Sequence, residues 1–193
     1  MGNVAVFGGT FNPFHIGHYE ILKALCNDPF FDEVFLIPDK LPPHKTCDFL
    51  ASDEDRIKMC ELACADFENA KLLLLEFERL GKSYTIDTVK ILKKKYKSTK
   101  FYITIGSDML STLDTWHNSE ELLKEASFTA FLRGTNRFDF EKDIEKMRRL
   151  GADIKVMNQE ITDISSSVLR KNLDKKYFPQ KIYDYIIEKR IYE

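Results

Sequence analysis

Short apolar runs alternate along the chain with longer segments in which apolar residues recur every three or four positions. The short runs are nearly continuous, which is typical of strands buried on both faces. They span residues 3–7, 33–37, 71–77, 101–105, 128–132 and 154–157. The longer segments have helical periodicity, and they begin near residues 17, 53, 84, 119, 140, 164 and 180. This alternation predicts an α/β fold, with a mostly parallel sheet, right-handed crossovers and helices on both faces.

Capping residues indicate where two of these helices begin. Ser52 or Asp53 is expected to cap one helix, and Ser83 is expected to cap the next. We expect the buried face of the first to carry Ile57, Cys60 and Cys64, and the second helix to carry the apolar residues Ile86, Val89, Ile91 and Leu92.

The position of a ligand site follows from the predicted sheet. In parallel sheets, ligands bind beyond the carboxyl ends of the strands, where the strand order reverses. Residues 8–18 follow the first strand and residues 106–108 follow the fourth. If these two strands are neighbours, both loops open on one crevice.

Composition narrows the class of protein. The 193 residues, 44% of them hydrophobic, are enough for one packed domain spanning 1–193. The net charge of −2 gives no reason to expect a nucleic-acid partner. No run approaches the roughly 18 apolar residues of a membrane span, so no membrane partner is expected either. Met1 leads directly into the first predicted strand, so no signal peptide is expected.

The cysteines point to a reduced, cytoplasmic protein. Cys26, Cys47, Cys60 and Cys64 form no CxxC pair. Cys60 and Cys64 lie one helical turn apart, and we interpret them as small buried residues, with a zinc-binding pair as the alternative.

The stretch Gly8–His18, GGTFNPFHIGH, carries the strongest chemical signal in the chain. Its glycines allow a sharp turn and a close approach to a ligand, and Asn12-Pro13 places it in a loop. A helix begins directly afterwards, so free N–H groups and the helix dipole face the loop and favour a phosphate. His15 and His18 are three residues apart, a spacing that aims both imidazoles the same way.

This stretch resembles the signature of the HxGH nucleotidyltransferases, enzymes that transfer a nucleotidyl group from ATP or CTP to a phosphate. The resemblance implies a Rossmann-like nucleotidyltransferase fold, with His18 and His15 as catalytic residues and His18 as a donor to the α-phosphate. It assigns ATP binding here to Gly8, Gly9, Thr10, Phe11, His15 and His18. One alternative is a tight turn with two packed histidines. Class I aminoacyl-tRNA synthetases also carry HIGH, but no later segment resembles their lysine-rich second motif.

Two further segments resemble ATP-binding elements of the same superfamily. Gly106-Ser107-Asp108 resembles its GxD element, and a carboxylate at a strand end suits ribose hydroxyls, although Asp108 could also cap a helix. Residues 164–170, ISSSVLR, resemble its ISS motif, which offers a second helix N-terminus and an arginine for phosphate oxygens. The alternative is a serine cap followed by a surface arginine. The residues assigned to ATP binding here are Gly106, Asp108, Ile164, Ser165, Ser166 and Arg170.

Three more segments resemble the bacterial nicotinate-nucleotide adenylyltransferases. They span residues 39–45, 83–88 and 105–123, and the resemblance assigns acceptor binding to His44, Lys45, Thr85, Trp116 and His117. Trp116 would stack on the pyridinium ring, with a core tryptophan as the alternative. His117 stands where a tyrosine is common, and Arg133-Gly134 lacks the proline of an RPG turn.

The resemblance implies transfer of the adenylyl group of ATP to nicotinate mononucleotide, giving deamido-NAD and pyrophosphate, a step of NAD biosynthesis. The phosphate acceptor is already ionised, so no general base is required. No metal-ligand cluster is found in the sequence, and Mg²⁺ would be held mainly through the ATP phosphates. The alternatives are another acceptor, such as nicotinamide mononucleotide or phosphopantetheine, and a non-catalytic nucleotide-binding regulator. The sequence leaves open whether the chain forms a homo-oligomer.

Overall fold

A parallel sheet forms the centre of the molecule. The computed structural model describes residues 2–40, 49–79, 83–134 and 136–193. Within these ranges the sheet has six strands in the order β3-β2-β1-β4-β5-β6, and every neighbouring pair is parallel. The strands are β1 (Gly2–Gly9), β2 (Glu33–Pro38), β3 (Ala70–Leu72), β4 (Thr99–Gly106), β5 (Ser127–Phe131) and β6 (Ile154–Met157).

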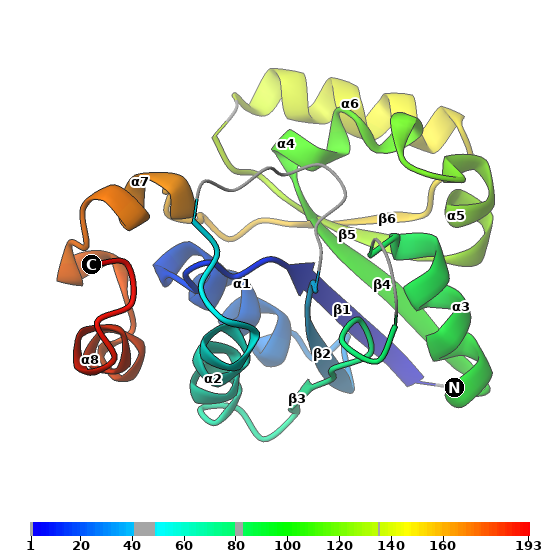
Figure 1. Cartoon of the computed structure of the whole chain (residues 1–193). Helices are drawn as coiled ribbons and strands as arrows, with labels where there is room; N and C mark the ends of the chain where they lie inside the picture. The colour runs from blue at the N-terminus through cyan, green and yellow to red at the C-terminus, as the bar shows by residue number, and fades with distance from the viewer. Residues whose placement is uncertain (1, 41–48, 80–82, 135) are drawn as a thin grey trace.

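Helices cover both faces of this sheet (Figure 1). One layer contains α1 (Ile16–Asn27), α2 (Asp53–Cys64) and α8 (Gln180–Glu188), whose apolar side chains share a core cluster with the sheet. The opposite layer contains α3 (Thr85–Lys95), α4 (Ser107–Leu110), α5 (Ser119–Glu125) and α6 (Arg137–Arg149). The helix α7 (Ser166–Lys171) and the 3-10 turns η1 (Leu113–Thr115) and η2 (Lys175–Tyr177) complete the described elements. The α/β, Rossmann-like fold predicted from the sequence is confirmed.

The strand β1 lies in the middle of the sheet and packs apolar side chains on both of its faces. Ala5 and Phe7 of β1 belong to the core cluster under α1, α2 and α8, while Val4 and Val6 belong to the cluster on the other face. Successive side chains of a strand point to opposite faces, so a strand covered on both sides needs apolar residues at every position.

The topology brings the two predicted loops to one edge. β1 pairs directly with β4, with Val6 opposite Ile103. The order of the sheet reverses between these two strands, and both of their carboxyl ends lie at the same edge. The loop after Gly9 and the loop after Gly106 therefore lie at the same edge of the sheet, on neighbouring strands, as the sequence predicts.

The third strand is shorter than predicted. The apolar run 71–77 gives a strand only at Ala70–Leu72, followed by a turn in which the amide of Phe77 donates to the carbonyl of Leu74 at 2.9 Å. The last bond of the ladder runs from the amide of Leu73 to the carbonyl of Leu36 at 2.9 Å. The next donor in this register would be the amide nitrogen of Pro38, which has no hydrogen, so the ladder ends.

Two helix details also differ from the prediction. Ser83 does not cap α3, because the cap position is Tyr84 and Ser83 is a buried residue before it. Ser52 does cap α2, accepting from the amide of Asp55 at 3.0 Å. The buried face of α2 is rotated by one residue, because Arg56 is fully buried whereas Ile57 is only half-buried. Cys60 and Cys64 are buried as expected.

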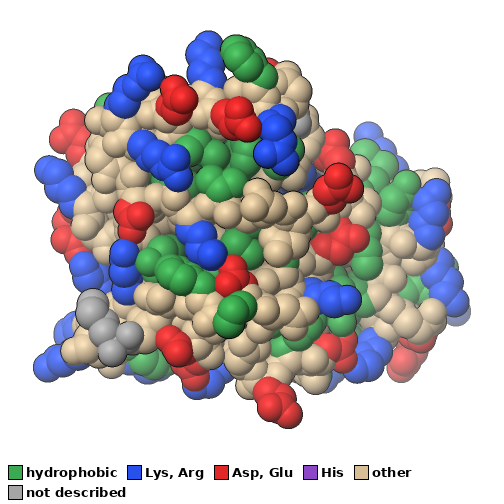
Figure 2. Space-filling model, turned by 180° about the vertical axis from the view of Figure 1, so that it is seen from behind, with side chains coloured by type: hydrophobic (Ala, Val, Ile, Leu, Met, Phe, Trp, Pro, Cys, Tyr) green, Lys and Arg blue, Asp and Glu red, His purple; other side chains and the backbone are tan. Residues whose placement is uncertain are grey.

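The surface is mixed in charge on the face that Figure 2 shows, with acidic and basic side chains interspersed between small apolar areas. Among the described residues, no helix is long and apolar enough to cross a membrane.

Candidate active site

The glycine-rich stretch leaves the sheet at Gly9 and enters α1 at Ile16. Its backbone turns through Phe11, which has a φ of 48°, and through a cis peptide bond between Asn12 and Pro13. A Cβ on Gly9 would lie 3.0 Å from the Phe11 ring, so this position has room only for glycine while the ring stays in place. The strand, turn and helix that the sequence predicts are all present.

The two histidines form a stacked pair at the start of α1. His15 is the N-cap residue and is fully buried, and its ring centroid lies 3.7 Å from that of half-buried His18. The backbone N–H of His15 donates to Nδ1 of His18 at 3.3 Å. A nitrogen that accepts a hydrogen bond carries no hydrogen, so neutral His18 bears its hydrogen on Nε2. The loop thus presents His18 as a donor through Nε2.

Aromatic side chains hold the His18 ring in place. Its centroid lies 5.1 Å from that of Phe11, edge to face, and 5.4 Å from that of Phe14. Both phenylalanines are buried, so the imidazole orientation is fixed by packing as well as by the bond to the backbone. Phe11 therefore reaches the site as a packing residue of the histidine pair.

The motif near the end of the chain lies directly against this loop. The Ser166 hydroxyl donates to the carbonyl of Pro13 at 3.1 Å, and Nη1 of Arg170 donates to the carbonyl of Asn12 at 2.7 Å. Ser165 caps α7, accepting from the amide of Val168 at 3.4 Å. Two motifs more than 150 residues apart in sequence are therefore joined by direct hydrogen bonds. In addition to the expected phosphate role, Ser166 and Arg170 hold the backbone of the first loop.

A second connection between these motifs was not predicted from the sequence. The Glu20 carboxylate accepts from the backbone N–H of Thr162 at 2.7 Å and from its hydroxyl at 2.9 Å. A Cβ on Gly17 would lie 2.8 Å from the Thr162 carbonyl oxygen, so this glycine of the HIGH tetrapeptide permits close contact between α1 and the segment before α7. No local signal marks Glu20, which has the pattern of an ordinary exposed helix residue.

The segment after β4 supplies the third part of the site. Asp108 lies exposed in the first turn of α4, and the cap position is Gly106, so Asp108 is not the cap. Its carboxylate folds back so closely that a Cβ on Gly106 would overlap with Oδ1. Ser107, between them, is buried and bonds to the backbone of Arg133, two residues after β5 ends.

Arg133 and Gly134 form the turn that lacks the expected proline. Gly134 has a φ of +63°, a conformation that favours glycine. Nη2 of Arg133 donates to the carbonyl of Ile164 at 2.5 Å, which connects the end of β5 to the segment before α7. These residues border a hollow of about 380 Å³ that extends along Asn158–Ile161.

Three of the predicted acceptor residues, Thr85, Trp116 and His117, lie near the contact between α3 and α5. Thr85 is the first residue of α3, and the ring of the preceding Tyr84 stacks on His117 at a centroid distance of 4.2 Å. Trp116 is half-buried against the core and borders a hollow of about 500 Å³. The wall of that hollow includes Glu120 and Glu121 and no residue of the glycine-rich loop.

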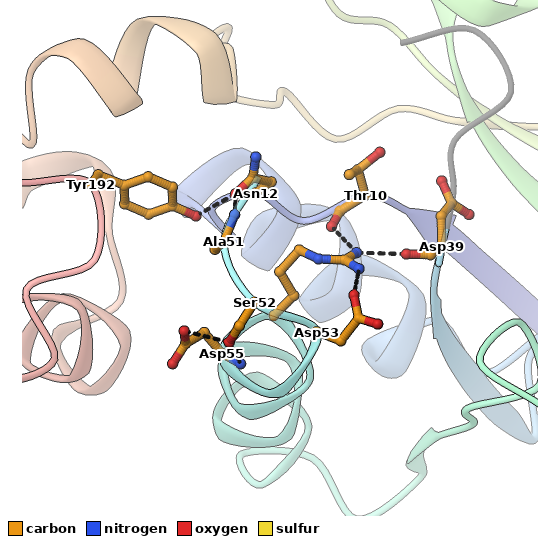
Figure 3. Close-up of polar contacts among 9 residues, drawn as sticks. Thr10, Asn12, Asp39, Ala51, Ser52, Asp53, Asp55 and Tyr192 are labelled. Carbon is orange, nitrogen blue, oxygen red and sulfur yellow. Dashed lines mark hydrogen bonds and ion pairs between the residues drawn. The ribbon is translucent and has the colours of Figure 1, made fainter. Parts of the chain in front are cut away.

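His44 and Lys45 lie outside the described residues. The chain re-enters the described part at Phe49, whose carbonyl accepts from the Asn12 side-chain amide at 2.9 Å. The oxygen of that amide accepts from the Ala51 N–H at 3.1 Å and from the Tyr192 hydroxyl at 2.7 Å (Figure 3). The Asn12 side chain thus fastens the glycine-rich loop to the segment before α2 and to the C-terminal residues.

The thiols of Cys60 and Cys64 suit a structural role. Burial raises the pKa of the Cys64 thiol to about 12 and the pKa of Cys60 well above its usual value, so both stay protonated at neutral pH. Among the described residues, no group of three or more His, Cys, Asp or Glu side chains is arranged to hold a metal ion.

The fold and the paired loop motifs define a Rossmann-like nucleotidyltransferase, and comparison with known proteins supports this class. A sequence profile of the cytidylyltransferase-like family matches residues 6–172. The chain is 31% identical to a probable nicotinate-nucleotide adenylyltransferase of Listeria innocua, over 98% of this chain and 96% of that protein. It is 36% identical to the protein of the same name from Bacillus cytotoxicus, over the full length of both. The chain therefore belongs to the nicotinate-nucleotide adenylyltransferase family.

A solved structure shows the same fold. The nicotinic acid mononucleotide adenylyltransferase of Plasmodium falciparum, complexed with NaAD, superposes with a TM-score of 0.82 at 24% identity, over 100% of this chain and 98% of that one. The family resemblance stated from the sequence is confirmed.

Proposed function

We propose that this protein transfers the adenylyl group of ATP to nicotinate mononucleotide, forming deamido-NAD and pyrophosphate. The observation that carries the proposal is the direct bonding of Ser166 and Arg170 to the carbonyls of Pro13 and Asn12. These bonds place a serine-rich turn and an arginine beside the histidine pair, at the edge of the sheet where β1 and β4 end. Residues 1–193 act in this proposal as one nucleotidyltransferase domain.

The reaction joins an acceptor phosphate oxygen to the α-phosphorus of ATP and releases pyrophosphate. The acceptor phosphate is already ionised, so the protein needs to supply position and charge stabilisation rather than a base. The Nε2–H of His18 donates to the α-phosphate oxygens, where negative charge increases in the transition state. His15, buried under the His18 ring, fixes its position through stacking and through its backbone N–H.

Arg170 and Ser166 are assigned to the leaving pyrophosphate. A guanidinium has five N–H donors, and the bond to the Asn12 carbonyl uses one nitrogen, so Arg170 can hold the loop and a phosphate together. The exposed Asp108 carboxylate is assigned to the ribose of ATP, and Gly106 gives it the space to fold over the strand end.

We assign a divalent cation to this site as a partner of the substrate phosphates. The described residues offer no three-ligand cluster, and Mg²⁺ commonly binds through substrate phosphates and water with one or two carboxylates. When bound in that way, Mg²⁺ reduces the repulsion between the phosphates.

Trp116, Thr85 and His117 are assigned to the nicotinate ring and its carboxylate. The Tyr84–His117 stack and the ion pairs Lys90–Glu121 and Lys93–Glu125, at 2.8 and 2.6 Å, fix α3 against α5. Thr85 at the start of α3 and Trp116 just before α5 therefore lie on elements that contact each other. His44 and Lys45 of the undescribed segment are assigned to the same acceptor.

A pyrophosphate-release assay tests the proposal. The protein is given MgATP with nicotinate mononucleotide, nicotinamide mononucleotide or phosphopantetheine, and deamido-NAD is identified by mass. We expect nicotinate mononucleotide to be the best acceptor by kcat/KM. Comparable kcat/KM values for the two mononucleotides would show that the proposed acceptor is wrong. If no pyrophosphate is released with any of the three acceptors, a non-catalytic nucleotide-binding protein is favoured.

A further inference from the structure

Arg56 of α2 is the largest fully buried side chain that the structure describes. A charged group is almost never fully buried unless it is paired. Its Nη2 forms an ion pair with Asp53 at 2.6 Å, and its guanidinium carbon lies 5.5 Å from the centre of the Phe77 ring. A partly exposed Asp53 one turn away would not by itself require Arg56 to be buried, so the remaining contacts of Arg56 explain its position.

Those contacts are with the backbone of two loops. Nη1 of Arg56 donates to the carbonyl of Thr10 at 3.1 Å and to the carbonyl of Asp39 at 2.5 Å. Figure 3 shows Thr10, Asp39 and Asp53 converging on one guanidinium through dashed contacts, which are the bonds from Arg56. A further bond joins the same loops directly, from the amide of Asp39 to the carbonyl of Gly9 at 2.9 Å.

The two loops belong to different parts of the site. Thr10 lies in the glycine-rich loop assigned to ATP, and Asp39 begins the segment that leads to His44 and Lys45, assigned to the acceptor. We infer that Arg56 is a positioning residue, which fixes the ATP loop and the start of the acceptor segment at one separation. This inference rests on the proposed function. In-line transfer depends on the distance between two bound anions, and a misplacement of about 1 Å can cost about 100-fold in rate.

The test uses Arg56→Lys, which keeps the positive charge but has a single ammonium in place of the planar fork. We expect kcat/KM to fall about 10–100-fold for ATP and for nicotinate mononucleotide alike, because both loops move. Asp53→Asn is the matched variant: it removes the ion pair and leaves both carbonyl bonds, so we expect both kcat/KM values to stay within about 3-fold of wild type.

A second readout does not depend on activity. Hydrogen exchange at the Asp39 amide reports the bond to the Gly9 carbonyl, and we expect it to be about 10-fold faster in Arg56→Lys than in wild type. Met147→Ala, on the buried face of α6, provides a variant of lowered Tm with both loops intact. The positioning role is wrong if Met147→Ala loses kcat/KM and Asp39 protection as Arg56→Lys does. It is also wrong if Arg56→Lys changes neither kcat/KM nor Asp39 protection. If wild type forms no deamido-NAD, the proposed function fails, and the exchange measurement still decides whether Arg56 holds the loops together.

Discussion

Replacing His18 by asparagine or by glutamine tests the roles of its two ring nitrogens separately. Nδ1 accepts from the His15 backbone N–H at 3.3 Å, which leaves Nε2 as the donor assigned to the α-phosphate. The amide of an asparagine side chain lies close to the Nδ1 position, and that of a glutamine side chain lies close to the Nε2 position. His18→Asn therefore keeps the acceptor for His15 and loses the donor, whereas His18→Gln keeps a donor near the phosphate.

The expected magnitudes differ for activity and for stability. Loss of one preorganised donor lowers kcat about 100–1000-fold, or about 2.7–4 kcal/mol. Loss of the neutral bond to the His15 N–H costs about 0.5–1.5 kcal/mol. For a chain of this size, each kcal/mol lowers Tm by about 2–4 °C. We expect His18→Asn to keep its Tm and lose turnover, and His18→Gln to lose a little Tm and regain about 10-fold in kcat over His18→Asn.

The assay is pyrophosphate release at saturating MgATP and nicotinate mononucleotide, with Tm measured by calorimetry on the same samples. His18→Ala serves as the reference that lacks both groups. Equal kcat values for the asparagine and glutamine variants, or turnover of His18→Asn near that of wild type, would falsify the assignment of Nε2 as the donor.

Four other predictions address the rest of the structure. Arg170→Ala should weaken ATP binding about 10–100-fold more than acceptor binding, with only partial rescue by lysine, and titration of each ligand checks this. Trp116→Ala should weaken the binding of nicotinate mononucleotide by about 0.5–2 kcal/mol and leave ATP binding largely unchanged. An equal loss of affinity for both ligands would show that Trp116 serves only as a core residue. Glu20→Ala leaves the N–H and hydroxyl of Thr162 without their acceptor, so we expect a loss of about 1–3 kcal/mol in the free energy of unfolding, measured with urea. Burial, with a hydrogen bond to an α2 carboxylate, raises the pKa of Tyr185 to about 12. This pKa is higher in the folded state than in the unfolded state, so the Tyr185 hydroxyl contributes fully to stability below about pH 10. That contribution is lost as the pH rises towards about 12. We therefore expect the Tm of Tyr185→Phe to fall less than that of wild type over this interval.

The sequence determined the elements and the edge of the sheet at which the site lies. Strands such as 101–105 are recognisable because a strand covered on both faces must be apolar at every position, and this property is local. The loop at Gly8–His18 is recognisable for a similar reason, since glycines, Asn12-Pro13 and a helix start define it without distant contacts. Alternation of strands and helices then implies a parallel sheet, whose carboxyl edge holds the ligand loops.

The tertiary structure alone decided how the parts of the site are connected. Periodicity placed Ile57 on the buried face of α2, but backbone carbonyls of two distant loops draw Arg56 inside instead. The apolar run 71–77 predicted a long strand, but its ladder ends where the neighbouring strand has Pro38. Similarly, Arg170 bonds to the Asn12 carbonyl across 158 residues of sequence. A hydrogen bond between residues far apart leaves no periodic pattern in either segment, because the partner of a polar group is selected by the folded topology and not by its neighbours in sequence.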